Sequence, residues 1–77
     1  YKKAKEYFKQ TIQSKPDFPY VYYALGILCD REKHYNEAIV YYKKFLDLAP
    51  KDKSSSSINN RLVLLKKFVK NNNGKKK

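Results

Sequence analysis

Apolar and polar residues follow one another along this chain at the spacing of amphipathic helices. In residues 1–14 the apolar or small positions recur every three or four residues, which places them on one helical face. These positions are Ala4, Phe8, Thr11 and Ile12. Pro16 ends this helix, because proline disfavours helical geometry in the residue before it. The same kind of pattern predicts further helices over residues 19–32, 36–48 and 58–70.

Prolines and turn-forming residues separate the predicted helices. Pro19 suits the first turn of the second helix, and Asp17 is available nearby as its cap. Pro50 ends the third helix, and a polar linker follows over residues 53–57. The composition then changes to "NNNGKKK", which predicts a disordered basic tail over residues 71–77.

Two segments of the chain repeat each other, without a gap, at an offset of 34 residues. The segment "YKKAKEYFKQTIQSKP" aligns with "YNEAIVYYKKFLDLAP". The identical pairs are Tyr1 with Tyr35, Ala4 with Ala38, Tyr7 with Tyr41, Lys9 with Lys43 and Pro16 with Pro50. A fixed period of this length indicates a protein built from repeated helical units.

The repeated unit also carries the residue pattern of a known family. The tetratricopeptide repeat has the pattern W-x2-L-G-x2-Y, then A-x3-F, then P, over about 34 residues. The corresponding residues here are Tyr22, Leu25, Gly26, Cys29, Ala38, Tyr42 and Pro50. Residues 19–52 therefore resemble one complete repeat, and residues 1–18 resemble the second half of a preceding one. The resemblance implies an all-α fold, a fragment of a right-handed solenoid of helix-turn-helix repeats with a C-terminal capping helix.

Gly26 lies in the middle of the second predicted helix, where glycine costs about 1 kcal/mol relative to alanine. Paired helices cross closely in a helix-turn-helix repeat, so we expect a contact at Gly26 that a side chain would prevent. Ala38 is expected to be the small residue that faces this contact. The motif tyrosines are expected in the core with their hydroxyls at its solvent edge. They are Tyr22, Tyr35 and Tyr42.

The resemblance implies a protein–protein interaction module with a scaffold or co-chaperone-like role. In such repeats the first helix of each unit lines a concave groove that holds a partner peptide or helix. The expected groove residues, an aromatic and apolar set with two charges at one end, are Tyr20, Tyr23, Ile27, Asp30 and Arg31. The alternative is that a neighbouring helix covers part of this face.

Some co-chaperone repeats hold the acidic tail of a chaperone with lysine, arginine and asparagine side chains. The matching positions here are Tyr23, Ala24 and Ile27, none of which is basic or an amide. Burying a carboxylate without a donor is costly, so an acidic terminus is expected to be a poor ligand. The expected ligand is an apolar or aromatic segment whose register Asp30 and Arg31 set.

The helix predicted over residues 58–70 is amphipathic and basic. Its apolar stripe contains Ile58, Leu62, Leu65, Phe68 and Val69, with Leu64 at the margin. The stripe spans roughly 160 degrees, whereas covering one neighbouring helix needs roughly 100 degrees. The helix is therefore expected to cap the repeat. The alternatives are a partner or homodimer surface, or a membrane-surface or calmodulin-type segment. Its basic patch consists of Lys66, Lys67 and Lys70.

Positive charge is concentrated at the C-terminal end of the chain. The net charge is +11, and residues 51–77 carry nine Lys/Arg against one Asp. Residues 1–50 carry nine Lys/Arg against six Asp/Glu. A basic end favours an acidic partner, nucleic acid or an anionic surface. Nucleic-acid or anionic-membrane binding through the last helix and tail is therefore the alternative function.

Residues able to support catalysis or bind a metal are few. The chain has one Cys and one His, too few for a nucleophile with its base or for a zinc site. Cys29 is expected to be a buried inert thiol, and His34 a turn residue. We therefore expect no enzyme activity, no cofactor and no metal. A lone cysteine and the lack of a signal-peptide pattern favour the cytoplasm, with the nucleus as an alternative.

Overall fold

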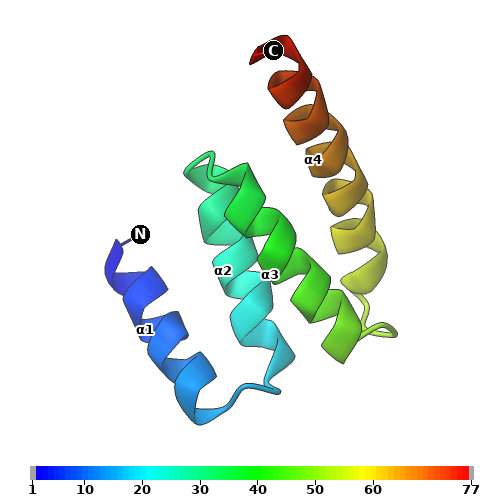
Figure 1. Cartoon of the computed structure of the whole chain (residues 1–77). Helices are drawn as coiled ribbons and strands as arrows, with labels where there is room; N and C mark the ends of the chain where they lie inside the picture. Colours follow the sequence, from blue (N-terminus) through cyan, green and yellow to red (C-terminus); the bar gives the residue numbers. More distant parts are fainter. Residues whose placement is uncertain (1, 77) are drawn as a thin grey trace.

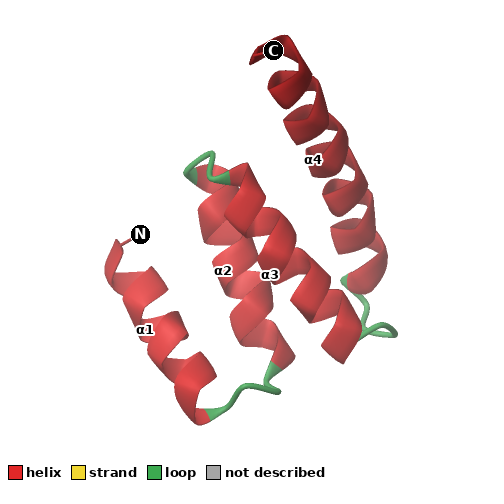
Figure 2. Cartoon of the chain, in the orientation of Figure 1, coloured by secondary structure: helices red, strands yellow, loops and turns green. Residues whose placement is uncertain are grey.

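The computed structural model describes the backbone of residues 2–76 and the side chains of residues 2–70. Over this part of the chain the fold has four α-helices and no strand, which confirms the predicted all-α class. The helices are α1 (Lys2–Ser14), α2 (Pro19–Arg31), α3 (Tyr35–Leu48) and α4 (Ser55–Lys76) (Figures 1 and 2). Tyr1, the predicted first residue of the first helix, lies outside the described residues.

The helices stand side by side in chain order (Figure 1). Within the described residues, Cα atoms approach to 8 Å between α1 and α2, α2 and α3, and α3 and α4, and between no other pair of helices. The contact between α2 and α3 is the most extensive. An arrangement in which each helix packs on its chain neighbours is that of a helical repeat protein.

The two ends of α2 differ from the predicted pattern. Phe18 occupies the cap position with an extended backbone, and no side-chain cap hydrogen bond forms there. The predicted cap at Asp17 is therefore corrected; Pro19, the next residue, has no N–H that needs a partner. At the other end the helix stops at Arg31, one residue earlier than predicted.

The turn from α2 to α3 depends on a residue in the left-handed region. The Lys33 N–H donates to the Asp30 carbonyl at 3.0 Å, and the His34 N–H donates to the Cys29 carbonyl at 2.8 Å. This pair of hydrogen bonds is the Schellman motif, which satisfies the last carbonyls of a helix. Lys33 has a φ of 65°, where glycine is usual and another residue costs about 1–2 kcal/mol.

The core lies between α2, α3 and α4. Leu25, Cys29, Ala38 and Phe45 are fully buried, with exposed fractions of 0%. From α4, Ile58, Leu62 and Leu65 complete the core and are 6%, 5% and 3% exposed. The buried residues therefore recur every three or four positions on each helix, as the apolar pattern of the sequence predicts.

Gly26 allows the side chain of Tyr42 to lie directly against α2. A Cβ atom at Gly26 would lie 2.5 Å from both Cδ1 and Cε1 of the Tyr42 ring, closer than real side chains approach. The expected close contact at Gly26 is therefore present. The atoms nearest to such a Cβ belong to the Tyr42 ring. Ala38 is fully buried in the same core cluster as Tyr42, and its position facing the contact stays a prediction.

Two of the motif tyrosines are buried, as predicted. Tyr22 and Tyr42 are 7% and 2% exposed, whereas Tyr35 is half-buried at the edge of the core. The Tyr22 hydroxyl donates to the Pro16 carbonyl at 2.7 Å, and the Tyr42 hydroxyl donates to Asp30 Oδ2 at 3.0 Å. Each buried ring thus reaches a polar partner with its hydroxyl, which removes the cost of burying that group.

The packing of α1 is lighter than that of the other helices. The predicted contact of α1 with α2 is present, yet no described residue of α1 is buried. Ile12 reaches the margin of the core, and Lys5 Nζ lies 2.9 Å from Glu32 Oε1. This single ion pair is only partly buried and contributes modestly, so α1 depends mainly on its partly buried apolar face.

The last helix, α4, is longer than predicted at both ends. It begins at Ser55 rather than residue 58, because the preceding loop supplies hydrogen bonds. The Ser54 N–H donates to Asp52 Oδ1 at 2.9 Å, and the Ser55 hydroxyl donates to the Ala49 carbonyl. The helix continues to Lys76, through residues predicted as a disordered tail, since no proline interrupts it. The side chains of residues 71–77 lie outside the described part.

Candidate functional site

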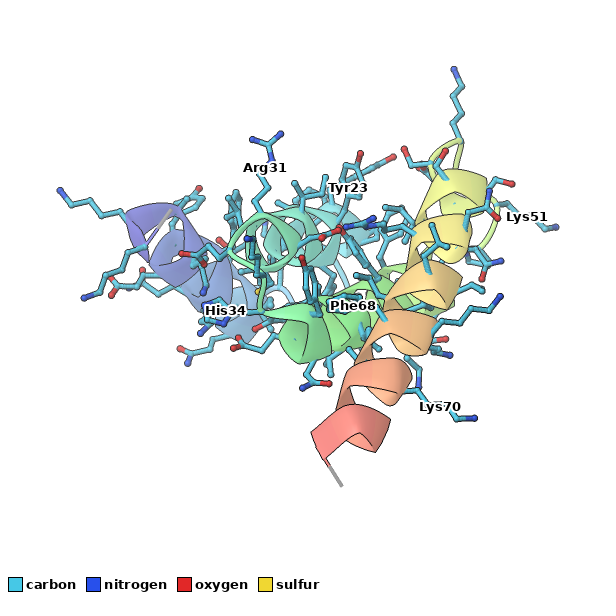
Figure 3. All side chains as sticks on the ribbon, turned by 90° about the horizontal axis from the view of Figure 1, so that it is seen from above. Tyr23, Arg31, His34, Lys51, Phe68 and Lys70 are labelled. Carbon is cyan, nitrogen blue, oxygen red and sulfur yellow. The ribbon has the colours of Figure 1, made fainter. Side chains whose placement is uncertain are left out.

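Four of the five predicted groove residues lie along the outer face of α2. Tyr20 is 48% exposed, and Tyr23 and Ile27 are half-buried. Arg31 is exposed at the C-terminal end of the helix, on the same side of the molecule as Tyr23 (Figure 3). Spacings of three and four residues place side chains on one helical face. The structure thus joins these four residues into one surface.

The two tyrosines of this surface rest on a buried ring of α3. The ring centroids of Tyr20 and Tyr23 lie 6.2 and 5.4 Å from that of Phe45, which is fully buried. The Tyr20 hydroxyl also donates to the carboxylate of Asp52. Rings held in this way present a preformed apolar surface, and a ligand that binds it orders few additional side chains.

A hollow of about 370 Å³ adjoins this surface, where α2, α3 and α4 meet. Its lining contains three of the predicted groove residues, and residues from the other two helices and the turn complete it. The lining residues are Ile27, Asp30, Arg31, Lys33, Tyr35, Tyr42 and Arg61. We refer to this feature below as the α2–α4 hollow. It contains both apolar and charged side chains, the mixture typical of ligand sites.

Asp30 is already paired within the chain. Arg61 Nε and Nη2 donate to its two carboxylate oxygens, each at 2.7 Å, and the Tyr42 hydroxyl donates at 3.0 Å. The hydrogen bonds from Arg61 hold the pKa of Asp30 below its usual value, against the opposing effect of burial. Asp30 therefore joins three helices, and its carboxylate is occupied by partners from the chain itself.

Among the described side chains, Arg61 is the one lining residue on α4, and the sequence pattern did not single it out. It lies 31 positions from Asp30, so no local spacing connects the two. On a helical wheel, however, Arg61 lies within the apolar stripe, between Phe68 and Leu65. A basic residue in such a position can pack its apolar stem on the face and extend its polar head beyond it. That position was the available signal.

The unpaired charge in the hollow is positive. Arg61 is neutralised by Asp30 at 2.7 Å. Among the described side chains, Arg31 and Lys33 have no carboxylate within ion-pair distance. Both are exposed. The α2–α4 hollow therefore carries two uncompensated cations at its rim.

The apolar stripe of α4 divides into a buried part and an exposed part. Ile58, Leu62 and Leu65 are buried, and Val69 is half-buried, so this part covers the core as a capping helix does. Leu64 and Phe68 are 58% and 48% exposed. The Phe68 ring meets the ring of Tyr35 edge-on, with centroids 5.0 Å apart, between α3 and α4 in Figure 3. The exposed part therefore adjoins the α2–α4 hollow.

The predicted basic patch lies on the outer side of α4. Lys66, Lys67 and Lys70 are exposed, and Figure 3 shows Lys70 directed away from the other helices. Among the described side chains none of the three is in an ion pair. The patch is thus separate from the hollow, which faces α2.

Groups with catalytic potential are dispersed. Cys29 is fully buried, burial raises the pKa of its thiol, and its Sγ lies 3.9 Å from Glu37 Oε2. His34 is exposed in the turn. Within the described residues, no three His, Cys, Asp or Glu side chains come together as metal ligands. The described helices also include none with the length and apolar character needed to cross a membrane.

The comparisons with known proteins agree with the geometry of the central helices. The family model of the tetratricopeptide repeat matches residues 19–52, the range that contains α2, α3 and the loop after them. No curated protein and no solved structure matches the chain. The matched range contains two helices joined by a short turn. The Gly26–Tyr42 contact and Pro50 both fall at motif positions. Residues 19–52 of the chain therefore match a tetratricopeptide repeat.

Proposed function

We propose that this chain binds a segment of another protein along the face of α2 and the adjoining flank of α4. Tetratricopeptide repeats are typically non-catalytic modules that bind protein partners. The finer proposal is a scaffold or co-chaperone-like role, in which Tyr20, Tyr23 and Ile27 hold a peptide or helix of the partner.

The observation that carries this proposal is the supported aromatic face of α2. Tyr20 and Tyr23 are partly exposed, although they are large and apolar, and their rings are held by Phe45. Aromatic side chains are enriched at protein interfaces, where rigid rings give much contact area for little entropic cost. Rings that the fold already holds in place are therefore suited to a protein interface.

A second apolar wall supports the same conclusion. Leu64 and Phe68 of α4 are exposed on the side of the helix that adjoins the α2–α4 hollow. A bound segment would therefore contact α2 on one side and α4 on the other. Burial of apolar area stabilises a complex by about 25 cal/mol per Å², before the cost of association is subtracted.

Selection from a library of random displayed peptides tests this proposal without a known partner. We expect the intact chain to select peptides that contain apolar or aromatic residues. Ile27→Ala and Tyr23→Ala are each expected to weaken binding of a selected peptide about tenfold or more, the size typical of an interface anchor. Isothermal titration calorimetry on purified variants measures the change.

Tyr7→Ala is the matched control, since Tyr7 is 65% exposed on α1. It removes the same side chain from a different helix and should leave binding unchanged. Circular dichroism confirms that each variant is folded. Selected peptides that bind Tyr23→Ala as tightly as the unchanged chain would refute the proposed groove.

Nucleic acid or an anionic membrane is the alternative ligand, and the exposed Lys66, Lys67 and Lys70 favour it. Binding driven by phosphate weakens steeply as salt rises, whereas burial of apolar rings does not. Phe68 is the one aromatic residue beyond residue 50, and its ring packs on Tyr35. Base stacking on this helix is thus not supported, and the peptide groove remains the preferred function.

A further inference from the structure

The α2–α4 hollow has a charge that the sequence pattern does not reveal. Four charged side chains line it, and Asp30 is the one acid among them. The carboxylate of Asp30 is held by Arg61 and by the Tyr42 hydroxyl. What remains at the rim is the positive charge of Arg31 and Lys33, in a chain with a net charge of +11.

Arg61 is also placed to donate into the hollow. Its Nε and Nη2 donate to Asp30, and a guanidinium has five N–H donors. The pairing with Asp30 therefore fixes the plane of the group while the donors on Nη1 stay outside that pair. An arginine already held in place by a carboxylate loses little freedom when it donates to a second acceptor.

Lys33 reaches the hollow from a strained position. Its φ of 65° belongs to a site in the turn that glycine would occupy without strain. Strained backbone positions cluster at sites where the side chain is needed. Here the side chain that takes the place of glycine is a cation at the rim of a hollow.

We propose that the α2–α4 hollow binds the side-chain carboxylate of an aspartate or glutamate in the partner segment, and that an apolar residue beside it packs on Leu64 and Phe68. The proposal rests on the proposed function and names the chemistry of the partner. Arg31, Lys33 and Arg61 supply the donors, and the half-exposed side chains of Leu64 and Phe68 on α4 supply the apolar contact.

This site differs from the clamp that the family uses for acidic chain termini. The clamp positions, Tyr23, Ala24 and Ile27, still supply no basic or amide group. The donors found here lie about one turn further along α2, in the turn after it, and on α4. Carboxylates bound by arginine and lysine form charge-assisted hydrogen bonds, which are about twice as strong as neutral ones.

Peptide selection with the charge of the selected pool as the readout tests the proposal. The library consists of random peptides whose two ends are both fused to a carrier protein, so that no peptide presents a terminal carboxylate. We expect the unchanged chain to select peptides rich in Asp and Glu next to apolar residues. The double variant Arg31→Ala/Lys33→Gly should select peptides that keep the apolar residues and lose the acidic excess.

A second double variant controls for the high net charge of the chain. Lys2→Ala/Lys3→Ala removes the same two charges from exposed positions on α1, and it should keep the acidic excess. The most enriched acidic peptide is then compared with its Asn/Gln counterpart by calorimetry. We expect the acidic form to bind about tenfold more tightly, the effect of one or two charge-assisted hydrogen bonds.

Lys33→Gly separates binding from stability. It relieves the strain in the turn, so its thermal midpoint should rise, while its affinity for the acidic peptide should fall about threefold or more, as expected for one lost ion pair. An increase in stability without loss of affinity would overturn the role of Lys33 and with it the proposal. A role confined to the turn predicts that the thermal midpoint rises while the affinity stays unchanged.

The outcomes for the hollow and for the groove are distinct. An apolar pool without acidic excess overturns the carboxylate site and leaves the groove intact. An acidic excess that survives in Arg31→Ala/Lys33→Gly also overturns it, because the charge then acts elsewhere. Failure to select any peptide rejects the proposed function itself.

Discussion

At the scale of single residues, the contact between Gly26 and Tyr42 sets how closely α2 and α3 approach. The glycine costs about 1 kcal/mol of helix propensity. Full burial of a large aromatic side chain contributes about 1.5–3 kcal/mol, and Tyr42 is 2% exposed. The packing gained therefore exceeds the propensity lost. The Tyr42 hydroxyl, held by Asp30 at 3.0 Å, prevents the ring from turning away.

We predict that Gly26→Ala destabilises the chain even though alanine is the better helix former. The new Cβ would lie 2.5 Å from two atoms of a packed ring, and overpacking of this kind costs about 1–3 kcal/mol. After the gain in helix propensity is subtracted, the net loss of stability should be up to about 2 kcal/mol. The thermal midpoint should fall by about 4–8 °C for each kcal/mol.

The Tyr42→Leu background supplies the control for this prediction. A smaller side chain leaves room at Gly26, so Gly26→Ala should cost less there or become stabilising. Thermal unfolding, followed by circular dichroism, measures the stability of the unchanged chain, of each single variant and of the double variant. If Gly26→Ala raised the midpoint of the otherwise unchanged chain, the close contact would not be the reason for the glycine.

At the scale of helices, a polar connection holds α4 in addition to its apolar stripe. Asp30 on α2 accepts from Tyr42 on α3 and from Arg61 on α4. The same cap could be formed by apolar residues alone, since Ile58, Leu62 and Leu65 are buried. The directional hydrogen bonds of Arg61 fix how α4 is rotated and shifted along its axis relative to α2. The position of α4 in turn sets the shape of the hollow.

We predict that Asp30→Asn lowers stability at neutral pH and has a smaller effect in acid. The pKa of Asp30 is lowered in the folded chain by its hydrogen bonds from Arg61. The stability it contributes is therefore full above the ordinary aspartate pKa of about 3.9 and is lost as pH falls through the lower, folded value. The loss at neutral pH should be about 1–2 kcal/mol.

Chemical denaturation of both chains from neutral to acidic pH measures this difference. The two curves should converge at the acidic end, because the unchanged Asp30 then becomes neutral like the asparagine. Asp47→Asn, at an exposed position on α3, is the control and should show no such convergence. A difference between Asp30→Asn and the unchanged chain that stays constant with pH would contradict the prediction.

At the scale of the whole molecule, each helix packs on its chain neighbours and α4 presents an apolar flank at one edge. Leu64 and Phe68 on this flank are about half exposed. The residues around them on α4 are basic or amide, and α4 contains no acidic residue. Two copies that met through this flank would bury apolar area but bring like charges together.

We predict weak self-association through α4 that strengthens as salt rises. Salt screens repulsion between copies that each carry a net charge of +11, while the burial of Leu64 and Phe68 persists. Sedimentation equilibrium at low and high salt measures the association. Leu64→Ser should abolish it, and Val40→Ser, at an exposed position on α3, should not. A chain that remains monomeric at high salt and high concentration would contradict the prediction.

Much of the fold could be predicted from local spacing. The helix bounds, the 34-residue repeat and the buried face of α4 agree with the structure, since each depends on residues three or four positions apart. The features that differ from the prediction are the cap of α2 and the length of α4. The α2 cap differs because Pro19 reduces the need for one, and α4 is longer because the serine loop begins its first turn.

The sequence by itself determined which residues form helices, which face of each helix is apolar, and that residues 19–52 make one repeat. These properties follow from intervals along the chain. The tertiary structure alone decided that Tyr42 faces Gly26 and that Arg61 pairs with Asp30. It also decided that Arg31 and Lys33 lie beside a hollow without an ion pair among the described side chains. Such pairings depend on the angle and offset at which packed helices cross, which local spacing does not encode.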